Sequence, residues 1–98
     1  SIEALPAIVA AVGQDIEVWM DGGIRSGQDV LKAWALGAKG TLIGRAMAYG
    51  LGAMGEAGVS KALEILHKEL DITMAFCGHT NILGVNQSIL LPGTFPKI

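Results

Sequence analysis

Alternating helical and extended segments restrict the folds open to this chain more than any other feature. The spacing of apolar residues predicts a helix over residues 1–12, which Ser1 caps, with Pro6 near its start and Gly13 ending it. Residues 17–20 and 41–43 are predicted strands, and a helix over residues 26–37 lies between them. This order is typical of βα units around a parallel sheet.

Two strands alone cannot form a stable sheet with both faces covered. The second predicted strand, Thr41-Leu42-Ile43, is apolar apart from one hydroxyl group and shows no alternation, as strands of parallel sheets covered on both faces usually do. The composition agrees, because 51% of the 98 residues are hydrophobic and only 16% are charged, an apolar surplus for a free-standing domain of this size. We therefore expect an α/β fold completed by further strands, from the rest of the same barrel or from copies of the chain.

The chain after the second strand is predicted to be mainly helical. A glycine-rich passage over residues 49–58 precedes an amphipathic helix over residues 59–70, on which Glu64 and Lys68 form a favourable i,i+4 pair. Asp71 is expected to cap a further short helix that ends near Gly78. The tail, residues 79–98, has a mixed pattern that predicts no element.

Charge and cysteine content exclude several functions. A net charge of −2 provides no basic field for nucleic acid. The single cysteine, Cys77, allows no internal disulfide and no paired-cysteine metal site, and we expect it to be buried. No apolar run reaches the roughly 18 residues that span a bilayer, and residues 1–12 lack the basic start of a signal peptide. The expectation is a soluble protein of a reducing compartment without a metal site.

A glycine–arginine loop follows the first predicted strand. Gly22 and Gly23 can adopt positive φ and let a ligand approach the backbone closely. Their amides, together with the start of the next helix, which Ser26 can cap, are suited to an anion. Arg25 adds a planar fork that fits phosphate oxygens. Asp21 is acidic, so its expected partner is a hydroxyl group such as a sugar alcohol.

The second loop, Gly44-Arg45-Ala46, repeats this arrangement after the second strand. In α/β barrels the loops after the last two strands commonly bind phosphate. The spacing lets Arg25 and Arg45 reach one phosphate. Each loop alone also fits a tight turn with an arginine paired to a surface carboxylate, because short glycine motifs often match by chance. Two such loops after consecutive strands favour the phosphate site.

These motifs resemble one protein family. Asp21-Gly-Gly-Ile-Arg-Ser-Gly-Gln-Asp-Val, followed by Ala35-Leu-Gly-Ala, Ile43-Gly-Arg-Ala and Tyr49-Gly, is similar to the FMN-dependent 2-hydroxy acid dehydrogenase/oxidase family, which includes L-lactate dehydrogenases, glycolate oxidase and mandelate dehydrogenase. The resemblance extends over residues 1–78 and is densest over residues 21–58. It implies that residues 1–98 are the C-terminal part of a (β/α)8 TIM barrel, carrying strands seven and eight.

The resemblance also implies FMN as the cofactor and a role for each loop residue. Asp21 is expected near the ribityl chain. The remaining positions form the expected phosphate cradle: Gly22, Gly23, Arg25, Gly44 and Arg45.

For the parent protein, the resemblance implies oxidation of a lactate-like L-2-hydroxy acid to a 2-keto acid. In this family a His and an Arg from a loop upstream of Ser1 supply the base and the clamp for the substrate carboxylate. Neither has a match here, so no catalytic residue is assigned and the 98 residues alone are expected to be inactive. The implied partners are the rest of the barrel, a small 2-hydroxy acid and further copies in a tetramer. The implied location is the cytoplasm, with peripheral attachment to the inner membrane left open.

Two other interpretations stay open. The segment could belong to another phosphate-binding barrel, an FMN-dependent isomerase or a nucleotide dehydrogenase, and a His-Gly-Gly-Arg-type loop before Ser1 would distinguish these enzymes. It could instead be a small non-catalytic protein that self-associates through exposed barrel edges.

Several side chains that are often functional are expected to be structural. The two histidines are predicted on the surface, His67 on the polar side of a helix and His79 after its end. Trp19 and Trp34 are predicted packing residues. Met47 and Met54 are predicted to fill gaps in the core.

Overall fold

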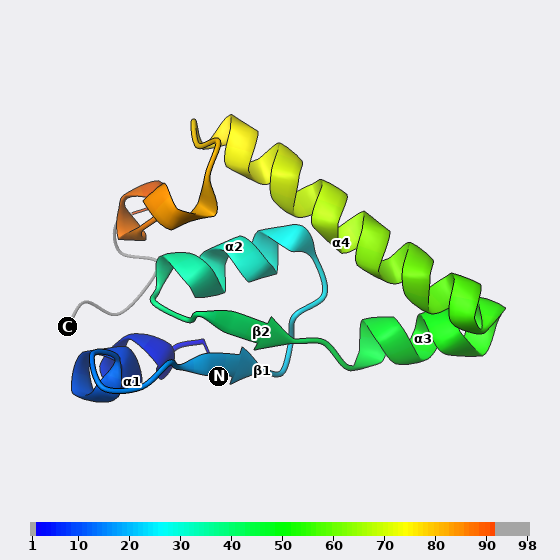
Figure 1. The fold of residues 1–98 in the computed structure, drawn as a ribbon, viewed down its shortest axis with the longest axis horizontal. Coiled ribbons are helices and arrows are strands. Elements are labelled where there is room, and N and C mark those ends of the chain that lie inside the picture. Colours follow the sequence, from blue (N-terminus) through cyan, green and yellow to red (C-terminus); the bar gives the residue numbers. More distant parts are fainter. Residues whose placement is uncertain (1, 92–98) are drawn as a thin grey trace.

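The computed structural model describes residues 2–91 and confirms the predicted alternation of helices and strands (Figure 1). The α/β class follows directly from the element order, which is α1 (Leu5–Val12), β1 (Trp19–Asp21), α2 (Gly27–Ala35), β2 (Gly40–Leu42), α3 (Arg45–Met54), α4 (Glu56–Phe76), η1 (Ile82–Gly84) and η2 (Gln87–Ile89). Pro6 lies in the first turn of α1 and Gly13 is its C-cap, as predicted. The helix begins at Leu5, with Ala4 as its N-cap, so the predicted start at residue 1 is too early; Ser1 itself lies outside the described residues.

The two strands form a parallel pair, with α2 as the connection between them. Their register sets Trp19 opposite Gly40, Met20 opposite Thr41 and Asp21 opposite Leu42. Parallel pairing brings the carboxyl ends of both strands to the same edge of the sheet. The loops that follow β1 and β2 therefore start side by side.

One face of the strand pair is covered and the other is open. Met20 is buried among side chains of α1 and α2. Its neighbour in the strand, Trp19, is 57% exposed, and Leu42 on the paired strand is 49% exposed. Because successive strand residues point to opposite faces, these apolar groups mark the uncovered face. Trp19 packs its ring against Gly40, where a Cβ would come within 2.8 Å of it, but it is far less buried than a packing role predicts.

Helix α2 lies between two hydrophobic clusters. Ala33 belongs to the cluster shared with α1 and β1, whereas Leu31 and Ala35 belong to the cluster shared with α4 and the residues after it. Leu31 is 1% exposed and Ala33 is fully buried. Packing on both sides holds α2, and hence the loop that precedes it, in a defined position.

Helix α4 is longer than the sequence predicts. It runs without interruption over Glu56–Phe76, so the predicted break and new helix at Asp71 are wrong. Leu66, Leu70 and Met74 follow one another at four-residue spacing and pack toward α2, and this continuous stripe carries the helix past Asp71. The ion pair of this helix joins Lys61 Nζ to Glu64 Oε1 at 3.8 Å, in place of the predicted Glu64–Lys68 pair.

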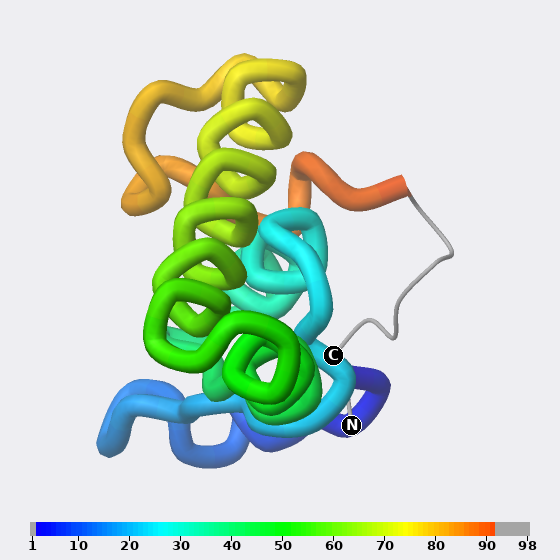
Figure 2. Tube along the Cα trace, turned by 90° about the vertical axis from the view of Figure 1, so that its right-hand side faces the viewer, coloured from blue at the N-terminus to red at the C-terminus, as the bar shows by residue number. Residues whose placement is uncertain are grey.

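The glycine-rich passage is also helical. Helix α3 occupies Arg45–Met54, and Gly55, with φ of 62°, turns the chain into α4. A Cβ at Gly58 would overlap the carbonyl oxygen of Gly50, so the absence of side chains lets α3 and α4 touch through their backbones. Both views place α4 beside α2 and α3 (Figure 1 and Figure 2).

Some predicted burials are wrong. Cys77 is exposed, because it caps the end of α4 next to Phe76, which is itself 88% exposed. Met47 and Met54 are exposed on α3 rather than filling gaps in the core. Trp34 is half-buried in the cluster between α2 and α4, as a packing residue should be.

Of the two histidines that were predicted on the surface, only one is fully exposed. His67 is exposed, as predicted, while His79 is half-buried and its main-chain N–H donates to the Met74 carbonyl at 2.9 Å. Within residues 2–91, no helix combines the length and the apolar character that crossing a bilayer requires.

Loss of the predicted helix cap at Ser26 should have a measurable cost. Ser26 Oγ accepts a hydrogen bond from the Asp29 N–H at 3.2 Å. We expect Ser26→Ala to destabilise the full-length protein by about 1 kcal/mol, because it leaves an N–H at the helix start unsatisfied. The matched control is Ser60→Ala within α4, which removes an exposed hydroxyl from a helix interior and should cost nothing. Urea unfolding of both variants compares the two, and equal stabilities would contradict the capping role.

Candidate functional site

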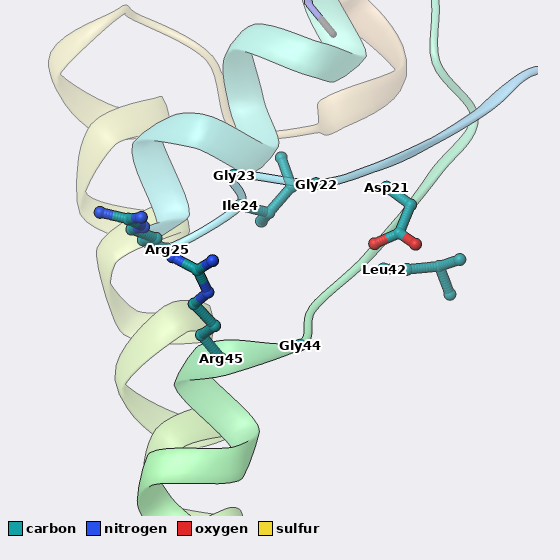
Figure 3. Close-up of a pocket in the computed structure, with 8 residues that line it drawn as sticks. All are labelled: Asp21, Gly22, Gly23, Ile24, Arg25, Leu42, Gly44 and Arg45. Atoms are coloured by element: carbon teal, nitrogen blue, oxygen red, sulfur yellow. The ribbon is translucent and has the colours of Figure 1, made fainter.

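The loops after β1 and β2 line one cleft of about 300 Å³ (Figure 3). All six residues predicted from the sequence lie on it: Asp21, Gly22, Gly23, Arg25, Gly44 and Arg45. Ile24 and Leu42 complete the lining. Parallel register is the reason, because it places Asp21 opposite Leu42 at the last position of both strands.

The two glycines of the first loop are required by their backbone conformation. Gly22 has φ of 101° and Gly23 has φ of 76°, in the region that side-chain-bearing residues rarely adopt. A Cβ at either position would have no neighbour within 4 Å, so the backbone there faces open space. The loop therefore offers main-chain groups that a ligand can approach without meeting a side chain.

Local hydrogen bonds order the second half of this loop. Asp29 Oδ2 accepts the Arg25 N–H at 3.0 Å, while Ser26 Oγ accepts the Asp29 N–H. These two bonds resemble a capping box, with Asp29 accepting from Arg25 instead of from Ser26, and they set where α2 begins. The positive end of the α2 dipole thus lies directly after the loop that lines the cleft.

The second arm of the cleft is the start of α3. Arg45 is the first residue of this ten-residue helix, and its N-cap, Gly44, has no side chain to satisfy the first N–H groups. Two helix N-termini therefore adjoin the same cleft, and both favour a negatively charged ligand.

The guanidinium groups of Arg25 and Arg45 are available to a ligand. Both side chains are exposed, and Arg45 extends from α3 toward the loop that carries Arg25 (Figure 3). Among residues 2–91, only Lys61 and Glu64 form an ion pair with a nitrogen–oxygen distance under 4 Å. Neither arginine side chain is therefore paired with a described carboxylate. The alternative interpretation, in which each arginine pairs with a surface carboxylate, does not match this arrangement. Two unneutralised guanidinium groups beside one cleft are suited to a dianion.

Asp21 occupies the opposite end of the cleft. Its carboxylate extends on the side of Leu42, away from the two arginines (Figure 3). A carboxylate there can accept hydrogen bonds but would not share an anion with the arginines. The cleft thus has a cationic end and an acceptor end.

Sequence reasoning missed Ile24. This side chain is 5% exposed and belongs to the cluster of α1, β1 and α2, so it anchors the loop between Gly23 and Arg25. An isolated apolar residue inside a glycine–arginine loop is the signal that could have identified it. Among the described residues, no group of three or more His, Cys, Asp or Glu side chains could hold a metal ion.

The sequence matches an established family and several well-described relatives. A family model described as FMN-dependent dehydrogenase matches residues 1–92. The chain is 51% identical over 90 residues to an L-lactate dehydrogenase of Caulobacter vibrioides. This aligned region covers 92% of this chain and 24% of that protein. It is 49% identical over 96 residues to a pre-mycofactocin synthase of Mycobacterium tuberculosis, covering 97% of this chain and 24% of that protein.

The fold has counterparts among solved structures. A soluble mutant of the membrane-associated (S)-mandelate dehydrogenase from Pseudomonas putida superposes with a TM-score of 0.85 at 41% identity. The match covers 90% of this chain and 25% of that one. The chain therefore spans about a quarter of the length of the relatives that it matches.

Proposed function

The chain belongs to the FMN-dependent dehydrogenase family, a family of TIM-barrel enzymes, and on this premise we propose that residues 1–98 are the C-terminal part of the barrel domain and bind the FMN phosphate. One observation carries the proposal. Arg25 and Arg45 follow neighbouring parallel strands and line one cleft, and their guanidinium groups form no ion pair among the described residues. In α/β barrels the loops after the last two strands are a common phosphate site.

The residues present fit a flavin phosphate. The open backbone at Gly22 and Gly23 leaves room for phosphate oxygens, and the uncapped start of α3 adds N–H donors beside Gly44. The two arginines supply charge-assisted hydrogen bonds. Asp21, at the acceptor end of the cleft, would accept a hydroxyl of the ribityl chain. When bound, FMN supplies the redox chemistry, and this segment holds and orients it.

For the whole protein we propose oxidation of an L-2-hydroxy acid to a 2-keto acid. An L-lactate dehydrogenase and an (S)-mandelate dehydrogenase among the relatives support this reaction class. Neither histidine lines the cleft, since His67 is exposed on α4 and His79 follows that helix, which supports a segment without the catalytic base. The base and the clamp for the substrate carboxylate would come from other parts of the barrel. We also propose that the whole protein forms a tetramer, which the resemblance of its motifs to the family implies.

The location of the whole protein is part of the proposal. We propose a cytoplasmic enzyme, with peripheral attachment to the inner membrane as the alternative. Among the solved relatives, one (S)-mandelate dehydrogenase is a monotopic membrane protein, which supports keeping that alternative.

A second candidate is a different reaction on the same scaffold. The pre-mycofactocin synthase is nearly as similar to this chain as the L-lactate dehydrogenase, at 49% and 51% identity. The phosphate cradle would be common to both candidates, because it holds the cofactor rather than the substrate.

Purification of the full-length protein with its native flavin tests these proposals. We expect a flavin absorption spectrum and release of FMN, identified by mass. Under anaerobic conditions, L-lactate or (S)-mandelate should bleach the flavin, whereas the D-enantiomers serve as the matched control. A protein without flavin contradicts the phosphate site. Bound FMN that no 2-hydroxy acid reduces contradicts the reaction and favours the second candidate.

A further inference from the structure

A hydrogen bond joins α4 to the start of α2 across 42 residues of sequence. The main-chain N–H of Gly27 donates to Glu69 Oε1 at 3.2 Å. Glu69 is half-buried and forms no ion pair within residues 2–91. Its carboxylate therefore satisfies an N–H at the first position of α2, where the helix dipole favours a negative charge.

This bond differs in kind from the other side-chain hydrogen bonds of residues 2–91. Each of those joins residues no more than four positions apart, as Asp29 does with Arg25. Local bonds order a loop internally but do not place it relative to a distant element. Glu69 is thus the side chain whose hydrogen bond ties the start of α2 to another helix.

Close backbone contact supports the bond. Gly27 is buried, and a Cβ there would lie 2.6 Å from both the Leu66 carbonyl oxygen and the Glu69 carbonyl carbon, and would overlap the Leu70 nitrogen. The first residue of α2 therefore rests directly on the backbone of α4. The Thr73 hydroxyl, which donates to the Glu69 carbonyl at 2.7 Å, lies on the following turn of α4.

The same helix also positions the second arginine. Helix α4 meets α3 where Gly50 and Gly58 touch, and Arg45 is the first residue of α3. Helix α4 thus contacts both α2, which follows Arg25, and α3, which begins with Arg45. Figure 2 shows α4 running past both α2 and α3.

We propose that Glu69 is a positioning residue for the phosphate end of the cleft. Its bond to Gly27 fixes the start of α2, and with it the preceding Arg25, at a defined position relative to Arg45. The inference rests on the proposed function, since it concerns the same phosphate site. Glu69 acts through its acceptor oxygen, because the bond to Gly27 needs an acceptor and no particular charge. The negative charge of Glu69 repels a dianion. If repulsion were its main effect, removing that charge would strengthen FMN binding, whereas a positioning role predicts weaker binding.

Flavin affinities of the full-length apoprotein test this role. The probes are FMN and riboflavin, which differ in the phosphate group. Glu69→Ala should weaken FMN binding about tenfold while leaving riboflavin binding within about threefold, since only the phosphate end loses its alignment. Glu69→Gln keeps an acceptor oxygen of the same reach and should bind FMN within about threefold of the wild-type protein. Glu64→Ala, an exposed carboxylate on the same helix, is the matched control and should change neither affinity.

Each other outcome is decisive. Equal losses for FMN and riboflavin would mean general destabilisation and overturn the positioning role. Tighter FMN binding by both Glu69→Ala and Glu69→Gln would mean that the residue acts only by repulsion. If Glu69→Ala does not fold, Glu69→Asp, which shortens the side chain and withdraws the acceptor, replaces it with the same expectation. A wild-type protein that does not prefer FMN to riboflavin would refute the proposed function itself, independently of Glu69.

Discussion

Replacing Arg25 and Arg45 together by alanine is expected to weaken FMN binding by the full-length protein by at least about a hundredfold. Each arginine offers charge-assisted hydrogen bonds to the phosphate, and each such bond contributes roughly 1.5–3 kcal/mol. Both side chains are exposed in the cleft and neither packs into a core cluster, so their removal should leave the fold intact. Apoprotein titration with FMN, followed by flavin fluorescence, measures the loss.

Riboflavin and a remote lysine provide the controls for this prediction. Riboflavin lacks the phosphate, so its affinity should stay within about threefold in the double variant. Lys61→Ala removes a positive charge from an exposed pair on α4 and should not affect FMN, because surface ion pairs contribute only about 0–1 kcal/mol and this lysine does not line the cleft. An FMN affinity unchanged in the double arginine variant would refute the phosphate site.

Gly58→Ala is expected to destabilise the full-length protein by about 3 kcal/mol or more. The new Cβ would overlap the carbonyl oxygen of Gly50 and lie 2.6 Å from its carbonyl carbon. Both partners are helix backbone, so neither can move without separating α3 from α4. Because α3 begins with Arg45, the separation should also release FMN. Thermal unfolding and the flavin content of the purified variant measure the two effects.

Gly52→Ala is the matched control on α3. A Cβ at Gly52 meets nothing within 4 Å, and the residue is exposed inside the helix. Alanine there should stabilise the protein by about 0.5–1 kcal/mol, because glycine loses more conformational freedom in a helix. The same substitution thus has opposite signs at two glycines 6 positions apart. A Gly58→Ala variant as stable as Gly52→Ala would contradict a stabilising role for the backbone contact between α3 and α4.

The cleft that the six predicted residues line was predictable because its determinants are local. Each arginine follows a strand within four residues, and parallel βα units bring consecutive strand ends to one edge. Ser26 carries its own capping signal in the next three residues. The predicted strands deviate by one or two residues from Trp19–Asp21 and Gly40–Leu42, since three-residue strands have few side chains to mark their ends.

The errors concern residues whose environment comes from distant parts of the chain. Asp71 is a good helix cap in isolation, yet α4 continues through it because Leu70 and Met74 pack toward α2. The low helix propensity of the glycines in residues 49–58 indicates a loop. Two of them, Gly50 and Gly58, instead form the contact between α3 and α4. Cys77 is hydrophobic in character and nevertheless exposed, because nothing among the described residues covers the end of α4.

The amino-acid sequence by itself determined the class of fold, the order of the elements and the two loops that meet at the cleft. These depend on periodicity, capping and glycine conformation, which act within a few residues. Only the tertiary structure decided that one long helix bridges the arms carrying Arg25 and Arg45, and that Glu69 meets Gly27. The contact between Glu69 and Gly27 joins residues 42 positions apart, and its geometry depends on how whole helices pack rather than on any local preference.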